Sequence, residues 1–295
     1  MNYLYKDLAF DHDDYTVDEL RDMDYEYDDY SMSDPDFRDL AFDDYGIEEP
    51  EVFLDVPYVP TDEKVVQAML DLAEVTSKDL LYDLGCGDGR IVVAAAMDRN
   101  ARGIGIDLDP MRIADAMEYA GNTGVEHMVD FLEGDLLEED FSQATVVTLY
   151  LLDLVNVELR PRLLNELRPG TRIVSHAFDM GDWRADERKS FSGINLFKWF
   201  VPAKVNGSWQ WQATSGETYK VELQQKYQRL KGKAWVNGKK AQLTSALLRG
   251  DLLELQIQTD ADSQPISFVM RCEAEQLVAA DGDLQATPAV RPTEV

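Results

Sequence analysis

Three glycines at alternate positions constrain the fold of this chain more than any other feature. Gly85, Gly87 and Gly89 follow a short apolar run, 80–84, and precede a stretch with a helical pattern, 91–97. Glycine allows positive φ angles and lets a ligand lie against bare backbone. The order of these segments predicts a buried strand, a tight turn that binds a ligand, and the start of a helix.

Two carboxylates flank this turn and restrict the ligand. The spacing G-x-G-x-G differs from the G-x-G-x-x-G of dinucleotide sites, which place a pyrophosphate at the helix N-terminus. Asp83 and Asp88 would repel a pyrophosphate and attract a cation. S-adenosylmethionine (SAM) fits this charge, because it carries a sulfonium, an ammonium and one carboxylate that N–H groups of the turn can hold. A nicotinamide dinucleotide site and a turn without a ligand are the alternatives.

A third acidic residue strengthens this interpretation. Asp107 ends an apolar, glycine-containing run about 20 residues beyond the turn, where an acid can accept hydrogen bonds from both ribose hydroxyls. At this point the sequence resembles the class I SAM-dependent methyltransferases. The resemblance implies an α/β fold with a Rossmann-like, doubly wound, mostly parallel sheet. It also implies that SAM contacts the residues Asp83, Gly85, Cys86, Gly87, Gly89 and Asp107, and that Asp135 contacts the adenine amino group.

Longer phrases resemble the small lysine methyltransferases that act on the mitochondrial ATP-synthase c-subunit, and their bacterial relatives. These phrases are VPYVP at 56–60, DLGCGDGRIV at 83–92 and RPGTRIVS at 168–175, the last followed by an aromatic residue and Asp182-Trp183. The resemblance implies N-methylation, with a protein lysine as a possible acceptor. A small-molecule O- or N-methyltransferase and a non-catalytic SAM-binding scaffold are the alternatives.

Four side chains are candidates for positioning the methyl acceptor or accepting its proton. Tyr150 and Asp153 lie at the end of a nearly continuous apolar run, and His176 directly follows the next expected strand. Ligands of doubly wound folds bind at this carboxyl edge of the sheet. Tyr58 lies in a proline-flanked strap, and we expect it to face the transferred methyl group beside the amino-acid end of SAM. A purely structural role is the alternative for His176 and for the strap.

The first 50 residues form an acidic, tyrosine-rich tail. Residues 1–51 contain 19 acidic and three basic side chains, a net charge of −16, and the phrase DLAFD occurs twice. With so little aliphatic content, this segment cannot bury enough surface to offset its ordering entropy. We expect it to be disordered, or to dock on a basic partner or on a site of the protein itself.

The character of the chain changes from Asn195 onward. Short β-type runs alternate there with turn signals such as Asn237-Gly238, which favours a two-residue hairpin. The runs 196–201 and 209–212 are expected to complete the sheet of the enzyme. We therefore divide the chain into an acidic tail at 1–50, a methyltransferase domain at 51–213, an antiparallel β meander at 214–280, and a loose tail at 281–295.

Composition excludes several classes of function. No apolar run reaches the length of about 18 residues that a transmembrane helix needs, and the N-terminus lacks the pattern of a secretory signal. Two distant cysteines fit the reducing cytoplasm and form no metal motif. The net charge of −29 repels phosphates, so nucleic acid is not an expected partner.

Overall fold

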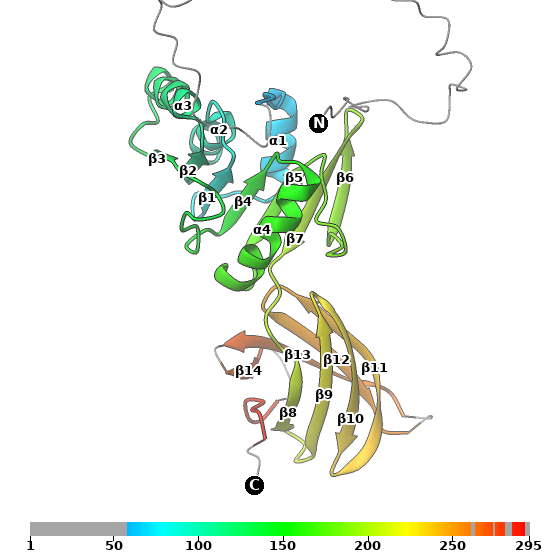
Figure 1. Ribbon diagram of the computed structural model, residues 1–295. Helices are drawn as coiled ribbons and strands as arrows, with labels where there is room; N and C mark the ends of the chain where they lie inside the picture. Colours follow the sequence, from blue (N-terminus) through cyan, green and yellow to red (C-terminus); the bar gives the residue numbers. More distant parts are fainter. Residues whose placement is uncertain (1–57, 261–262, 274, 281–284, 293–295) are drawn as a thin grey trace, which may run out of the picture. The chain divides into compact units, whose positions relative to one another are not determined.

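The computed structural model describes residues 58–260, 263–273, 275–280 and 285–292. The acidic segment 1–50 lies outside these residues, so the expectations about it stay predictions. The described residues belong to one compact unit, and this unit contains two sheets (Figure 1).

The first sheet has seven strands in the order β3-β2-β1-β4-β5-β7-β6 (Figure 1). The strands β1 to β5 are parallel, whereas β7 runs antiparallel to β5 and β6 runs antiparallel to β7. The strand bounds are β1 (Leu80–Leu84), β2 (Arg102–Asp107), β3 (Val129–Glu133), β4 (Val146–Leu149), β5 (Arg172–His176), β6 (Glu187–Phe191) and β7 (Ile194–Phe200). The strand order reverses between β1 and β4, where ligands of such sheets bind.

Helices cover both faces of this sheet, because the side chains of each buried strand alternate between the two faces. Leu81 of β1 packs in a core with the helices α1 to α3, whereas its neighbour Tyr82 packs in a second core with α4. The helix bounds are α1 (Glu63–Leu72), α2 (Arg90–Arg99), α3 (Pro110–Thr123) and α4 (Asp153–Glu166). The doubly wound, mostly parallel α/β fold is therefore confirmed.

The second sheet is an antiparallel meander in the order β14-β13-β12-β11-β10-β9-β8 (Figure 1). Its bounds are β8 (Gly207–Gln212), β9 (Thr218–Lys226), β10 (Arg229–Val236), β11 (Lys239–Arg249), β12 (Leu252–Gln258), β13 (Ile266–Glu273) and β14 (Gln276–Ala279). The run 209–212 lies in β8, so its assignment to the first sheet was wrong. Trp209 and Trp211 explain the difference, because their buried indoles join the core of the second sheet.

The second sheet closes on itself through the segment 285–290. Isolated β-bridges join Val290 to β8 and Gln285 to Ala213, the residue after β8, at one edge of the sheet, and join Ala289 to β14 at the other edge. Ala289 is fully buried in the core of this sheet. The expectation of a loose tail was therefore wrong for these residues, since they cover two edges that would otherwise expose unpaired backbone groups.

Hydrogen bonds connect the two sheets. The indole N–H of Trp183, in the loop after β5, donates to the side-chain oxygen of Gln228 at 3.1 Å. The hydroxyl of Tyr227 donates to the Asp182 carboxylate at 2.9 Å. Tyr227 and Gln228 form the turn between β9 and β10, so the second sheet is tied to the first by specific polar contacts.

Candidate active site

A buried carboxylate lies where β1 ends. Asp83 accepts a hydrogen bond of 2.7 Å from the hydroxyl of Thr148 on the adjacent strand β4. Burial raises the pKa of Asp83 to about 7, and the charges of Asp107 and Asp88 also raise it. Three carboxylates therefore share one small region, and a cationic ligand group beside them would favour the ionised form of Asp83.

The backbone N–H groups of the glycine turn are engaged within the protein. Those of Gly85 and Cys86 donate to the carbonyl of Ile106, at 2.8 and 3.0 Å, and that of Gly89 donates to the carbonyl of Cys86. The N–H of Gly87 donates to the Asp107 carboxylate at 2.8 Å. These four groups therefore fix the shape of the turn, and the expectation that N–H groups of the turn hold a ligand carboxylate stays a prediction.

The turn requires glycine at Gly87. Its φ angle of +52° lies in the left-handed region, and a Cβ atom there would approach the Tyr58 ring to 2.4 Å. The ring of Tyr58 thus lies directly on the bare backbone of the turn. This close approach places the strap that precedes α1 over the ligand-binding end of β1.

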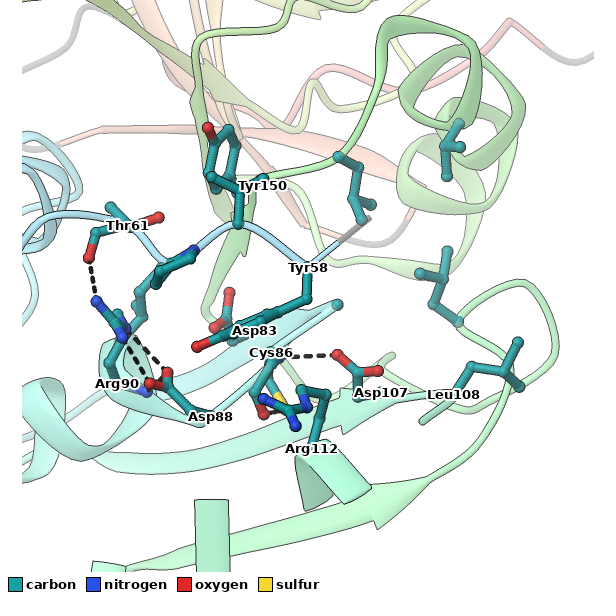
Figure 2. A pocket seen from close by; sticks show the side chains of 18 of the residues that line it. Tyr58, Thr61, Asp83, Cys86, Asp88, Arg90, Asp107, Leu108, Arg112 and Tyr150 are labelled. Atoms are coloured by element: carbon teal, nitrogen blue, oxygen red, sulfur yellow. Dashed lines mark hydrogen bonds and ion pairs between the residues drawn. The ribbon is translucent and has the colours of Figure 1, made fainter. Parts of the chain in front are cut away.

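Arg90 connects this strap to the turn (Figure 2). Its guanidinium pairs with Asp88 at 2.6 Å and donates to the carbonyl of Thr61 at 2.7 Å. Burial opposes ionisation of Asp88, but hydrogen bonds from Arg90 and Tyr58 outweigh it and lower the pKa of Asp88. The guanidinium of Arg112 lies 4.8 Å from the centre of the Tyr58 ring. Burial and the neighbouring Asp88 carboxylate raise the pKa of Tyr58.

Asp107 and Asp135 also line the cavity. Asp107 accepts from the N–H groups of Gly87 and Asp109, each with a different oxygen, and Asp135 accepts from the N–H of Leu137 at 2.8 Å. Three apolar side chains next to them in sequence, Leu108, Leu136 and Leu137, line the cavity as well. An apolar slot edged by carboxylates suits a nucleoside, whose base is flat and whose ribose hydroxyls donate hydrogen bonds.

Tyr150 and His176 stack on each other, with ring centres 3.8 Å apart. Tyr150 lines the cavity, whereas His176 is buried and its Nδ1 lies 3.2 Å from the hydroxyl of Thr61. Burial lowers the pKa of His176 to about 4, so the imidazole is neutral at physiological pH. His176 therefore supports both the Tyr150 ring and the strap.

The two remaining candidates, Cys86 and Asp153, lie in different environments. Cys86 lines the cavity, but burial strongly raises the pKa of its thiol, which is therefore neutral. Asp153 is the first residue of α4; it is exposed and accepts from the N–H of Asp179 at 3.2 Å. Asp153 and His176 are not among the described residues that line the cavity.

Sequence reasoning missed two cations of the site, Arg90 and Arg112. Both line the cavity beside its carboxylates. Arg90 directly follows the last glycine of the turn, and this position is the signal that was available for it. Arg112 follows Tyr58 by 54 positions in the chain, so only the tertiary structure reveals their contact.

Comparisons with known proteins agree with this geometry. Residues 83–187 match the family model described as the ANTKMT methyltransferase domain. A protein-lysine N-methyltransferase of Saccharolobus islandicus (strain REY15A) is 47% identical over 133 residues, which are 45% of this chain and 83% of that protein. The chain belongs to this family. It is a SAM-dependent methyltransferase, as the glycine turn and its carboxylates predicted.

More distant relatives include the ATP synthase c-subunit lysine N-methyltransferase of Xenopus laevis. That protein is 29% identical over 133 residues, which are 45% of this chain and 58% of the relative. The chain thus spans little more than half the length of that relative. The predicted resemblance to the c-subunit lysine methyltransferases is confirmed.

Among solved structures, the chain is similar to an RNA methyltransferase from Salinibacter ruber in complex with S-adenosyl-L-homocysteine. The identity is 50%, the match covers 50% of this chain and 96% of that one, and the TM-score is 0.49. Within the described part of this chain, no helix combines the length and the hydropathy needed to cross a membrane.

Proposed function

We propose that this enzyme transfers the methyl group of SAM to the ε-amine of a lysine in a protein. The observation that carries the proposal is the buried Asp83 carboxylate, which lies beside Asp107 and Asp88 at the end of β1. Relatives named for the methylation of protein lysines support the acceptor.

The residues of the cavity fit SAM in charge and in shape. Asp83 and Asp88 offer negative charge to a cation, Asp107 keeps acceptor capacity for ribose hydroxyls, and Asp135 borders the apolar slot for a base. Arg90 and Arg112 are the cations available to a carboxylate. When bound, SAM supplies a methyl group on a positively charged sulfur, whose departure needs no protonation.

The enzyme must hold the acceptor in line with the transferred group. Contact at about 3 to 3.5 Å between reacting atoms accounts for much of the rate that positioning provides. We assign this task to Tyr58 and Tyr150, because both rings line the cavity. An incoming lysine must also lose its proton, at a cost of about 1.4 kcal/mol for each unit by which its pKa exceeds the pH.

His176 is a poor choice for accepting that proton. A base whose pKa is about 4 would take a proton from an ammonium of pKa about 10.4 at a cost of roughly 9 kcal/mol. We therefore propose that His176 positions Tyr150 and Thr61, and that the proton leaves through water. Asp153 is exposed near the start of α4, and we propose that it attracts the approaching ammonium.

The charge of the chain supports a basic protein as the acceptor. Residues 1–51 carry a net charge of −16, which would attract a lysine-rich segment. We keep the sequence-based proposals that this segment binds a basic partner and that the enzyme acts in the cytoplasm. The second proposal rests on Cys86 and Cys272, both of which are free.

The test is to incubate the enzyme with SAM labelled on the methyl group and a lysate of its source cells. Label is expected in protein, and acid hydrolysis is expected to release methylated lysine. The Gly87→Ala variant is the control, since its added Cβ atom would displace the Tyr58 ring from the turn. Label confined to small metabolites would instead show a small-molecule methyltransferase, and SAM binding without production of S-adenosylhomocysteine would show a scaffold.

A further inference from the structure

The strands β9 to β11 carry a charge opposite to that of the chain. Their span, residues 218–249, contains eight basic side chains and one acidic side chain, whereas the whole chain has a net charge of −29. We define the basic face as the outward side of these strands: Lys220, Lys226, Arg229, Lys231, Lys233, Trp235 and Lys240. The inward side chains of the same strands, among them Val221 and Ala234, form the core.

The register brings these cations together. Cross-strand pairs on the basic face are Gln224 with Lys231 and Lys226 with Arg229. Glu222, the one acidic residue, is paired with Lys233 across the strands and makes an ion pair with Lys220 at 3.5 Å. The face is therefore a band of positive charge on neighbouring strands, interrupted by Glu222.

Most of these cations have no acidic partner among the described residues. Lys226 pairs with Asp182 at 2.8 Å, and Lys220 pairs with Glu222. Arg229, Lys231, Lys233 and Lys240 make no ion pair or side-chain hydrogen bond within the described part of the chain; all four are exposed. In a chain with twice as many acids as bases, four neighbouring cations without an ion pair indicate a surface that is kept for an anionic ligand.

An aromatic ring lies within this band. Trp235 is half-buried on β10, with Lys220 directly opposite on β9 and Lys240 directly opposite on β11. The ammonium of Lys220 lies 5.4 Å from the centre of the indole ring. Because neighbouring strands are about 4.8 Å apart, the two lysines flank the ring on both sides within about 10 Å.

We propose that the basic face binds single-stranded RNA, independently of methyl transfer. Ammonium and guanidinium groups contact phosphates, and an aromatic side chain between them offers a stacking platform for an unpaired base. An acidic peptide would use the cations but would not need the ring. RNA is favoured over DNA because its bases are commonly unpaired, whereas those of DNA lie in a duplex.

The net charge of −29 led us to expect no nucleic acid partner. For the basic face, the present proposal replaces that expectation. Charges farther away than about 8 Å are largely screened at physiological ionic strength. A polyanion on the basic face therefore responds mainly to the local positive charge. Part of the overall negative charge lies in residues 1–51, which are separate in sequence from β9 to β11.

The experiment measures binding of a fluorescent single-stranded RNA of mixed sequence to the full chain by anisotropy, at several salt concentrations. The expected Kd lies between about 10⁻⁴ and 10⁻⁶ M at physiological salt, and contacts to four phosphates give a slope of about −3 for log K against log salt. The variant Lys231→Gln/Lys233→Gln/Lys240→Gln should bind at least tenfold more weakly, with a slope near −1. Circular dichroism checks that each variant is folded.

Matched variants distinguish binding by the basic face from a general effect of the net charge of the protein. A control variant, Lys64→Gln/Lys78→Gln/Arg102→Gln, removes the same charge from exposed positions in the part of the chain that forms the first sheet and its helices. It should leave RNA binding within twofold. Trp235→Leu should weaken binding about fivefold or more without changing the salt slope, and Trp235→Phe should restore most of it. Absence of RNA binding, equal losses in the two triple variants, or displacement of RNA by an equally charged poly-glutamate peptide at the same concentration would overturn the proposal.

Discussion

At the scale of single residues, the site depends on a buried carboxylate, that of Asp83. Asp83 is paired with a neutral hydroxyl, that of Thr148, and not with a cation. Its carboxylate therefore lacks charge compensation in the absence of a ligand, and burial together with Asp107 and Asp88 raises its pKa to about 7. A position that is costly for folding and favourable for a cation is typical of a binding site.

This pKa makes SAM binding depend on pH. Below pH 7 the Asp83 carboxyl binds a proton, which a cationic ligand must displace, so affinity for SAM should rise with pH by up to about tenfold per unit between pH 5.5 and 7 and then level off. Titration calorimetry in buffers of different ionisation enthalpy should detect the released proton. A pH-independent Kd for SAM would contradict the assignment.

The same group should affect stability with the opposite sign. Because its pKa is raised from the usual value of 3.8 to about 7, the folded state holds the proton more tightly, and stability falls as pH rises through this window. Asp83→Asn keeps the acceptor for Thr148 and should raise Tm at pH 8, with little effect at pH 4. It should also weaken SAM binding at least tenfold. Asp130→Asn, at an exposed position of β3, is the control.

Gly87 provides a steric prediction. Gly87→Ala places a methyl group 2.4 Å from the Tyr58 ring at a φ angle of +52°, so the strap must move and SAM binding should fall below detection by calorimetry. Gly121→Ala is the matched control, because α3 leaves open space there, and it should raise stability by about 0.5 to 1 kcal/mol. Normal SAM affinity in Gly87→Ala would show that Tyr58 does not lie on the turn.

At the scale of elements, the strap before α1 is held at two points of the sheet. Arg90 at the start of α2 holds the carbonyl of Thr61, and His176 at the end of β5 holds its hydroxyl. The two anchors come from different elements, the helix α2 and the strand β5. The strap is thus a fixed wall of the cavity, and its position depends on both neighbouring elements.

The role of His176 follows from this arrangement. His176→Gln keeps a polar partner for Thr61, so its kcat should fall less than tenfold and the pH profile of kcat should keep its shape. Thr61→Val should give a similar loss, because it removes the same contact. Loss of a general base costs about 10²- to 10⁴-fold in rate, so a loss of that size in His176→Gln together with an altered pH profile would restore the proton-accepting role.

At the scale of the whole molecule, the two sheets have separate cores joined by polar contacts. Gln228 accepts from the fully buried Trp183 and donates to the carbonyl of Arg184 at 2.7 Å. The turn between β9 and β10 therefore provides hydrogen-bond partners for Trp183 and Arg184, which lie in the loop after β5 of the first sheet. The second sheet contributes to the stability of the enzyme even if it never touches the substrate.

Removing this contact should destabilise both sheets without affecting the site. Gln228→Ala leaves the indole N–H of Trp183 without a partner and should lower the free energy of unfolding by about 1 to 3 kcal/mol. SAM affinity should stay within twofold. Gln224→Ala, at an exposed position of β9, is the matched control and should change little. Urea melts and calorimetry measure the two effects; equal stability of the two variants would contradict this coupling.

The amino-acid sequence by itself determined the local chemistry of this protein. The glycine turn, the carboxylates Asp83 and Asp107 and the apolar run 145–152, which contains β4, each depend on neighbours in the chain, so periodicity and spacing revealed them and, with them, the fold class and the methyl donor. The β meander was also visible, because its turns are signalled locally by pairs such as Asn237-Gly238.

Only the tertiary structure decided which distant groups meet. The membership of β8 in the second sheet and the closure of that sheet by residues 285–290 depend on packing around Trp209 and Trp211. The support of Tyr150 by His176 and the approach of Arg112 to Tyr58 join residues separated by 26 and 54 positions, as their numbers show. The band of cations on β9 to β11 appears only when strand register places alternate residues on one face, since alternation in sequence does not say which strands are neighbours.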